Sequence, residues 1–166
     1  MTLDVNRLEQ FIADWKDTPY LAGQCERGVG VDCLRYIDAA LQYSTAQVLA
    51  PLPREAQDVA LHNPEVVKRV ARLMAGRFNM ETKARLDPPY RPGEVLCVRT
   101  KTKIKPLTRE EKVLKSPHHV LIVGPTGLLC WHAMNTGNPD TSKVSWVGVG
   151  GVLACYTVLQ IWRIKA

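Results

Sequence analysis

The sequence predicts a single-domain α+β protein over residues 1–166, with helices first and an antiparallel sheet after them. Two observations support this fold class. Apolar residues recur at helical spacing in the first half of the chain, whereas the second half holds short apolar runs bounded by turn residues. A short turn joins two of those runs, which is typical of antiparallel neighbours. The length and the 46% hydrophobic content suffice for one buried core.

Two helices are predicted in the first fifty residues. The first follows Asp4, a candidate N-cap, and has apolar residues at helical spacing. These residues are Leu8, Phe11, Ile12 and Trp15. A loop rich in glycine covers residues 18–31, and the second helix begins near Cys33 and extends to about Tyr43.

A helical insertion is predicted at about residues 50–85. Asn63 and Pro64 are a typical cap and first-turn pair, and the helix they start should end near residues 76–79. Its apolar face, which we expect to pack against the core, comprises Val66, Val67, Val70, Leu73, Met74 and Phe78.

Strands are predicted at residues 94–98, 119–123, 128–132, 143–147 and 156–164. A basic loop at about residues 99–117 separates the first two, either as a flap near a substrate groove or as a solvated connection. Residues 144–162 carry no charge, but their glycines and strand-like residues favour two buried strands with a Gly-rich bend over a membrane span.

The net charge of +6 is compatible with an anionic partner or with solubility alone. The five cysteines include no CxxC pair, so a zinc site or a disulfide framework is not supported. Cys97, Cys130 and Cys155 lie in apolar runs and are predicted to be buried. The first residues lack the pattern of a secretory signal, so we expect a protein made in a reducing compartment.

Cys33 stands at the junction between the Gly-rich loop and the second helix. The first turn of a helix has unpaired N–H groups and a partial positive charge, both of which favour a thiolate. The same N–H groups can stabilise an oxyanion. Cys33 is therefore the candidate nucleophile of a cysteine hydrolase.

His119 begins one strand of the predicted hairpin and His132 ends the other. The two histidines should be neighbours at the open end of the hairpin, and the alternation of side chains places both on one face. We expect that face to meet the helix that carries Cys33, with His119 as the base and His132 holding its tautomer. His62 and His118 are expected to lie elsewhere.

Further short motifs lie in order along the chain. They are Thr18-Pro19-Tyr20, Gly30-Val31-Asp32-Cys33, Pro92-Gly93-Glu94, His119-Val120-Leu121-Ile122-Val123-Gly124, Trp131-His132-Ala133 and Trp162-Arg163. With them the chain resembles the NlpC-like cysteine peptidases of the bacterial cell wall, and the resemblance spans nearly its whole length.

The resemblance implies a papain-like NlpC-type fold, with N-terminal helices packed on an antiparallel sheet or half-barrel. It implies Cys33 as nucleophile, His119 as base and His132 as the third polar residue, without a cofactor or metal. Tyr20 would shape the oxyanion and substrate site, and Asp32 would bind the amino end of a stem peptide or act as a helix N-cap. The implied substrate is a peptidoglycan stem peptide, cleaved at the D-glutamyl–diamino acid amide, and not a nucleic acid.

The chain departs from that family directly after the nucleophile. Leu34-Arg35-Tyr36 replaces the small residues usual there, so the bond cleaved stays open. Members are usually secreted with wall-binding repeats, and neither feature is found here. A phage tail-tip component, made in the host cytoplasm and assembled with tail-tip or baseplate proteins, fits this pattern. A delivered effector that reaches the periplasm also fits. The alternatives are a docking module without activity and an amidase or acyltransferase with a non-wall substrate.

Overall fold

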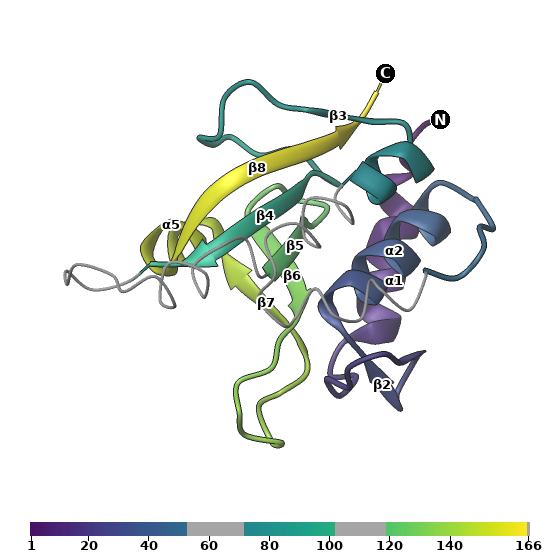
Figure 1. Cartoon of the computed structure of the whole chain (residues 1–166), viewed down its shortest axis with the longest axis vertical. Coiled ribbons are helices and arrows are strands. Elements are labelled where there is room, and N and C mark those ends of the chain that lie inside the picture. Colours follow the sequence, from purple (N-terminus) through teal and green to yellow (C-terminus); the bar gives the residue numbers. More distant parts are fainter. Residues whose placement is uncertain (53–71, 102–118, 166) are drawn as a thin grey trace.

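Two N-terminal helices lie against a six-stranded antiparallel sheet in the computed structural model (Figure 1). The structure describes residues 1–52, 72–101 and 119–165. The helices are α1 (Val5–Trp15), α2 (Cys33–Ser44) and α5 (Val149–Cys155). The strands are β1 (Cys25–Glu26), β2 (Gly30–Val31), β3 (Met80–Thr82), β4 (Val95–Thr100), β5 (His119–Val123), β6 (Leu129–Ala133), β7 (Val144–Gly148) and β8 (Tyr156–Ile164). The predicted α+β class is therefore confirmed.

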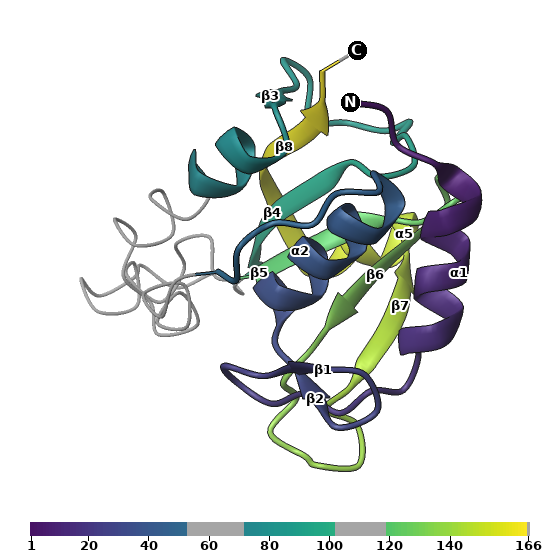
Figure 2. The ribbon, with the colours of Figure 1, turned by 90° about the vertical axis from the view of Figure 1, so that its right-hand side faces the viewer.

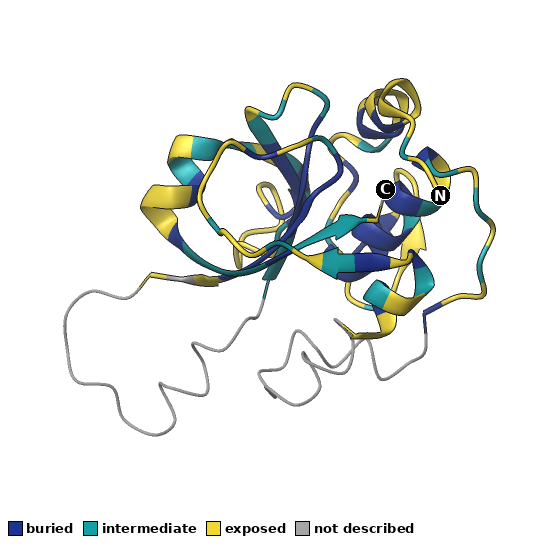
Figure 3. Ribbon diagram, turned by 90° about the horizontal axis from the view of Figure 1, so that it is seen from above, coloured by how far each residue is buried: buried dark blue, intermediate teal, exposed yellow. Residues whose placement is uncertain are grey.

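The sheet order is β3-β8-β4-β5-β6-β7, so the last strand of the chain lies between β3 and β4. Helices α1 and α2 cover one face and α5 lies on the other (Figure 2). One hydrophobic core joins α1 and α2 to Ile122, Trp131 and Ala133 of the sheet. A second core on the opposite face joins α5 to Leu121 and Cys130. The central strands and most of α2 are buried, whereas α1 is exposed along its outer side (Figure 3).

Helix starts follow the predicted capping residues. Asp4 accepts hydrogen bonds from the backbone N–H groups of Asn6 and Arg7, and α1 begins at the next residue. Asp32 does the same for α2 by accepting a hydrogen bond from the N–H of Arg35. The turn after β5 pairs it with β6 as an antiparallel hairpin, as predicted.

The Gly-rich bend predicted between the last two strands is wrong, because residues 149–155 form helix α5. Strand β7 is an edge strand, and three strands separate it from β8, so the chain must cross the sheet. Helix α5 makes this crossing, with Val152 buried against the sheet. The predicted burial of Cys155 is also wrong: it ends this short helix and is exposed.

The predicted helical insertion is described only at its end. Residues 53–71 lie outside the described residues, as does the predicted helix start at Asn63. Residues 72–77 are helical, and Met74 and Phe78 are buried, as the apolar face predicts, whereas the predicted burial of Leu73 is wrong because its side chain is exposed. Most of the predicted basic loop, residues 102–117, also lies outside the described residues.

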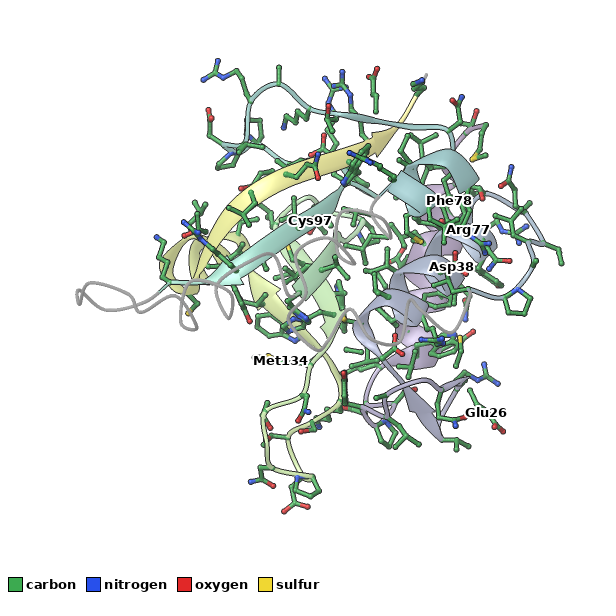
Figure 4. The ribbon with its side chains drawn as sticks, in the orientation of Figure 1. Glu26, Asp38, Arg77, Phe78, Cys97 and Met134 are labelled. Atoms are coloured by element: carbon green, nitrogen blue, oxygen red, sulfur yellow. The ribbon has the colours of Figure 1, made fainter. Side chains whose placement is uncertain are left out.

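A buried ion pair fastens the end of this segment to α2. Arg77 donates two hydrogen bonds, of 3.0 and 3.1 Å, to the two carboxylate oxygens of Asp38. It also donates one of 2.7 Å to the carbonyl of Ala50, so a single side chain ties together the two sides of residues 53–71. Figure 4 shows Arg77 and Asp38 side by side next to α2. Among the described residues, no helix is long and apolar enough to cross a bilayer.

Candidate active site

Cys33 is the first residue of α2, and Asp32 before it is the N-cap. The Asp32 backbone is extended, with φ −96° and ψ 170°, and its Oδ1 accepts a 2.9 Å hydrogen bond from the N–H of Arg35. The other oxygen, Oδ2, accepts one of 2.9 Å from the N–H of Gly23 in the preceding loop. These bonds fix where the helix starts and therefore where the thiol is held.

His119 and His132 meet at the open end of the β5–β6 hairpin. Ile122 pairs with Trp131 in this hairpin, so the two histidines are diagonal neighbours on one face. His119 Nε2 lies 2.7 Å from His132 Nδ1, within hydrogen-bonding distance. The sequence predicted this pair from the hairpin alone.

The face that carries the histidines is not the face covered by α2. Side chains alternate along a strand, so His119 and His132 share the face of Leu121 and Cys130, which pack toward α5. The expectation that the histidine face is the one that packs on α2 is therefore wrong. For the Cys33 sulfur to approach the histidines, the sheet must be open between its two faces.

The sheet is open where the pairing between β5 and β6 ends, which forms a split in the hairpin. The β5–β6 ladder includes only Ile122 and Val123 of β5. If the same register continued, Val120 would pair with Ala133. The N–H of Val123 bonds to Glu94 on the β4 side, so the N–H of Val120, three residues earlier, points to the β6 side. A backbone hydrogen bond from Val120 reaches Cys33 instead. The sulfur therefore lies at the split, beside the residue that directly follows His119.

The Cys33 thiol is a neutral group at pH 7 in this arrangement. Burial, followed by the negative charge of Asp32, raises its pKa to about 12, although backbone hydrogen bonds from Val120, Leu34 and Cys33 itself oppose the shift. The expected thiolate, favoured by the helix start, is thus outweighed by loss of water around the sulfur. Nucleophilic attack from this site requires a neighbouring base to take the proton.

His132 is suited to hold such a base. Burial lowers its pKa to about 4, so it is neutral at pH 7. Its Nδ1 can then accept a hydrogen bond from the Nε2–H of His119. In this tautomer, Nδ1 of His119 is the nitrogen through which a proton can be exchanged with a thiol.

Two tyrosines border the cluster. Tyr20 is half-buried, and its backbone N–H donates a 2.8 Å bond to the carbonyl of Ser142. Burial and then the proximity of Cys33 and Asp32 raise the pKa of Tyr20 to about 12, so its hydroxyl stays protonated. Tyr156 of β8 stacks on His119 with ring centroids 6.2 Å apart. Sequence reasoning missed Tyr156, because only strand pairing brings β8 near β5.

Asp32 is engaged by protein groups on both oxygens. In addition to its backbone bonds, Oδ2 lies 2.6 Å from Nη1 of Arg35, and both side chains are buried. The role of Asp32 as N-cap is confirmed, whereas its role in binding a substrate amine stays a prediction. No group of three or more potential metal ligands occurs among the described residues.

The fold and the site together define an α+β protein in which a cysteine begins a helix and a histidine pair lies on a hairpin whose first strand contacts that cysteine through Val120. Comparison of the chain with protein-family models and with curated protein sequences gave no match. The resemblance to NlpC-like peptidases therefore stays a prediction.

Proposed function

We propose that the protein is a cysteine hydrolase with a papain-like NlpC-type fold, in which Cys33, His119 and His132 form the catalytic group. The observations that carry the proposal are the 2.7 Å contact between His119 and His132 and the backbone hydrogen bond to the Cys33 sulfur from Val120, the residue after His119. A nucleophile, a base and a group that orients the base are the three parts that such catalysis needs.

The reaction follows from these positions. Nδ1 of His119 takes the proton of the Cys33 thiol as the sulfur attacks the carbonyl carbon of an amide. The N–H groups at the start of α2, with the protonated hydroxyl of Tyr20, stabilise the oxyanion. Protonated His119 then gives its proton to the leaving amine nitrogen, which breaks the C–N bond and leaves a thioester. His119 next removes a proton from water, which hydrolyses the thioester and restores the free thiol.

The substrate class rests on the resemblance described above. We propose a peptidoglycan stem peptide cleaved at the D-glutamyl–diamino acid bond, by a protein that works in a phage tail tip or as an effector delivered to the periplasm. The direct test is digestion of purified sacculi, with the released muropeptides identified by mass spectrometry. Wild type should release peptides with new amino ends, and Cys33→Ala should release none.

Cys97 supplies the matched control. It is also buried, its pKa is also raised to about 12 by burial, and its sulfur contacts the Trp162 side chain rather than the histidines. Cys97→Ala should retain the muropeptide products. Identical products from wild type and Cys33→Ala would refute the proposed function.

A second candidate is a docking module of a phage tail that keeps the fold without the activity. The burial of Cys33, only 6% exposed, favours it, because a substrate carbonyl must reach the sulfur. Phage carrying Cys33→Ala distinguish the two. Normal adsorption, DNA ejection and plating on thick-walled hosts would favour docking, whereas a loss of plating on these hosts alone would favour hydrolysis.

A further inference from the structure

The Asp32–Arg35 ion pair lies directly beside the candidate nucleophile. Nη1 of Arg35 is 2.6 Å from Oδ2 of Asp32, and the two side chains are 9% and 8% exposed. Both residues belong to the first turn of α2 and its cap, so neither can move without disturbing the helix start. The charges are thus fixed at one residue before and two residues after Cys33.

A buried carboxylate at this place opposes ionisation of the thiol. Two negative charges close together in a region with little water repel strongly, because solvent screening is weak there. The guanidinium against Oδ2 supplies the opposite charge at nearly the same place. It offsets part of the effect of the carboxylate, which still acts to raise the pKa of the Cys33 thiol.

We propose that Arg35 is a positioning residue whose guanidinium compensates for the Asp32 carboxylate and so keeps the Cys33 thiol able to ionise. The meaning of this role for catalysis rests on the proposed function. Tyr20, from the loop before β1, is the other titratable group that acts on the sulfur, and His119, at the start of β5, directly precedes the Val120 N–H that bonds to it. Because Tyr20 stays neutral at pH 7, Asp32 and Arg35 provide the fixed charges on the helix side.

The test is the pH dependence of Cys33 alkylation in the folded protein. Iodoacetamide labelling is followed on the Cys33 peptide by mass spectrometry, so that the other four cysteines do not contribute. Arg35→Gln should slow labelling about ten-fold at a fixed pH below the midpoint of the Cys33 labelling profile. This change corresponds to a rise of about one unit in the pKa of the Cys33 thiol. Arg35→Lys should restore most of the rate, because it keeps the charge.

Two more variants separate charge from structure. The double variant Asp32→Asn with Arg35→Gln should return labelling close to the wild-type profile, because both charges are gone and Asn still caps the helix. Arg77→Gln breaks a similarly buried pair with Asp38 on the same helix and is the matched control. It should reduce thermal stability without moving the Cys33 profile.

The outcomes decide the proposal clearly. An unchanged Cys33 profile in Arg35→Gln, or a double variant as slow as the single one, would overturn it. If Arg35→Gln does not fold, Asp32→Asn alone decides: labelling at fixed pH should become faster than in wild type, and an unchanged rate would overturn the role. If the labelling profiles are as expected but wild type does not cleave sacculi, the proposed function fails and the role of Arg35 stands. If wild type cleaves sacculi but the Cys33 labelling profile is unchanged in Arg35→Gln, the role of Arg35 fails and the proposed function stands.

Discussion

Acidification should weaken the fold through His132. Its imidazole is buried, and burial lowers its pKa from about 6.5 to about 4. Between these values the unfolded chain binds a proton that the folded protein does not. The free energy of unfolding therefore falls as the pH falls through this window, and the contribution of His132 is fully present only above about pH 6.5.

The magnitude follows from the two pKa values. The difference between the two pKa values corresponds to about 3 kcal/mol when the pH is below both values. At pH 4.5 most of that loss is reached, and linkage gives a decrease of about 2 kcal/mol relative to pH 7. Because His132 is only 3% exposed, solvent screening reduces this value little.

Urea unfolding of wild type and His132→Asn at pH 7 and pH 4.5 measures the effect. Asn removes the titration, and its amide oxygen can still accept a hydrogen bond from His119. The carboxylates are the same in both proteins, so the difference between the two pH dependences reports the loss of the His132 imidazole. The variant should lose about 2 kcal/mol less than wild type on acidification. Equal losses in the two proteins would refute the assignment of a buried neutral imidazole.

Two further predictions concern the stability of α2. Arg77→Met should lower the free energy of unfolding by about 3 kcal/mol in urea titrations, because Asp38 would be left buried without its cation. Arg85→Met, at the exposed pair with Asp87, should change it by less than about 1 kcal/mol, and equal effects would contradict the role of burial. Tyr36→Phe should raise the unfolding free energy by about 1 kcal/mol, because the buried Tyr36 hydroxyl has no hydrogen-bond partner among the described residues; a clear loss in thermal melts would contradict this.

The sequence predicted those parts of the site that depend on local rules. Capping by Asp32 placed Cys33 at a helix start, and the turn after β5 placed the two histidines together. The Asp32–Arg35 pair also had a local signal, since residues three apart on a helix are neighbours. Its significance was missed because burial, which makes the pair matter for the thiol, is a property of the whole fold.

Other features depend on contacts between distant segments. Strand β8 lies between β3 and β4, and no local pattern in β8 specifies that position. The same placement brings Tyr156 to His119, so this contact could not be predicted either. The pKa of Cys33 is raised, whereas a helix start was expected to lower it. The reason is related: the helix start is a local feature, whereas desolvation comes from the sheet packed against it.

The split between β5 and β6 explains how these parts can work together. In a fully paired hairpin, the N–H of Val120 would bond to β6, and a sulfur arriving from the α2 face would remain separated from histidines on the α5 face. With the ladder ending at Ile122, that N–H bonds to Cys33 instead, and His132 stays within 2.7 Å of His119 across the opening. The loss of strand pairing at this end of the hairpin therefore gives the Cys33 sulfur a backbone contact on the strand that carries His119, which the proposed site requires.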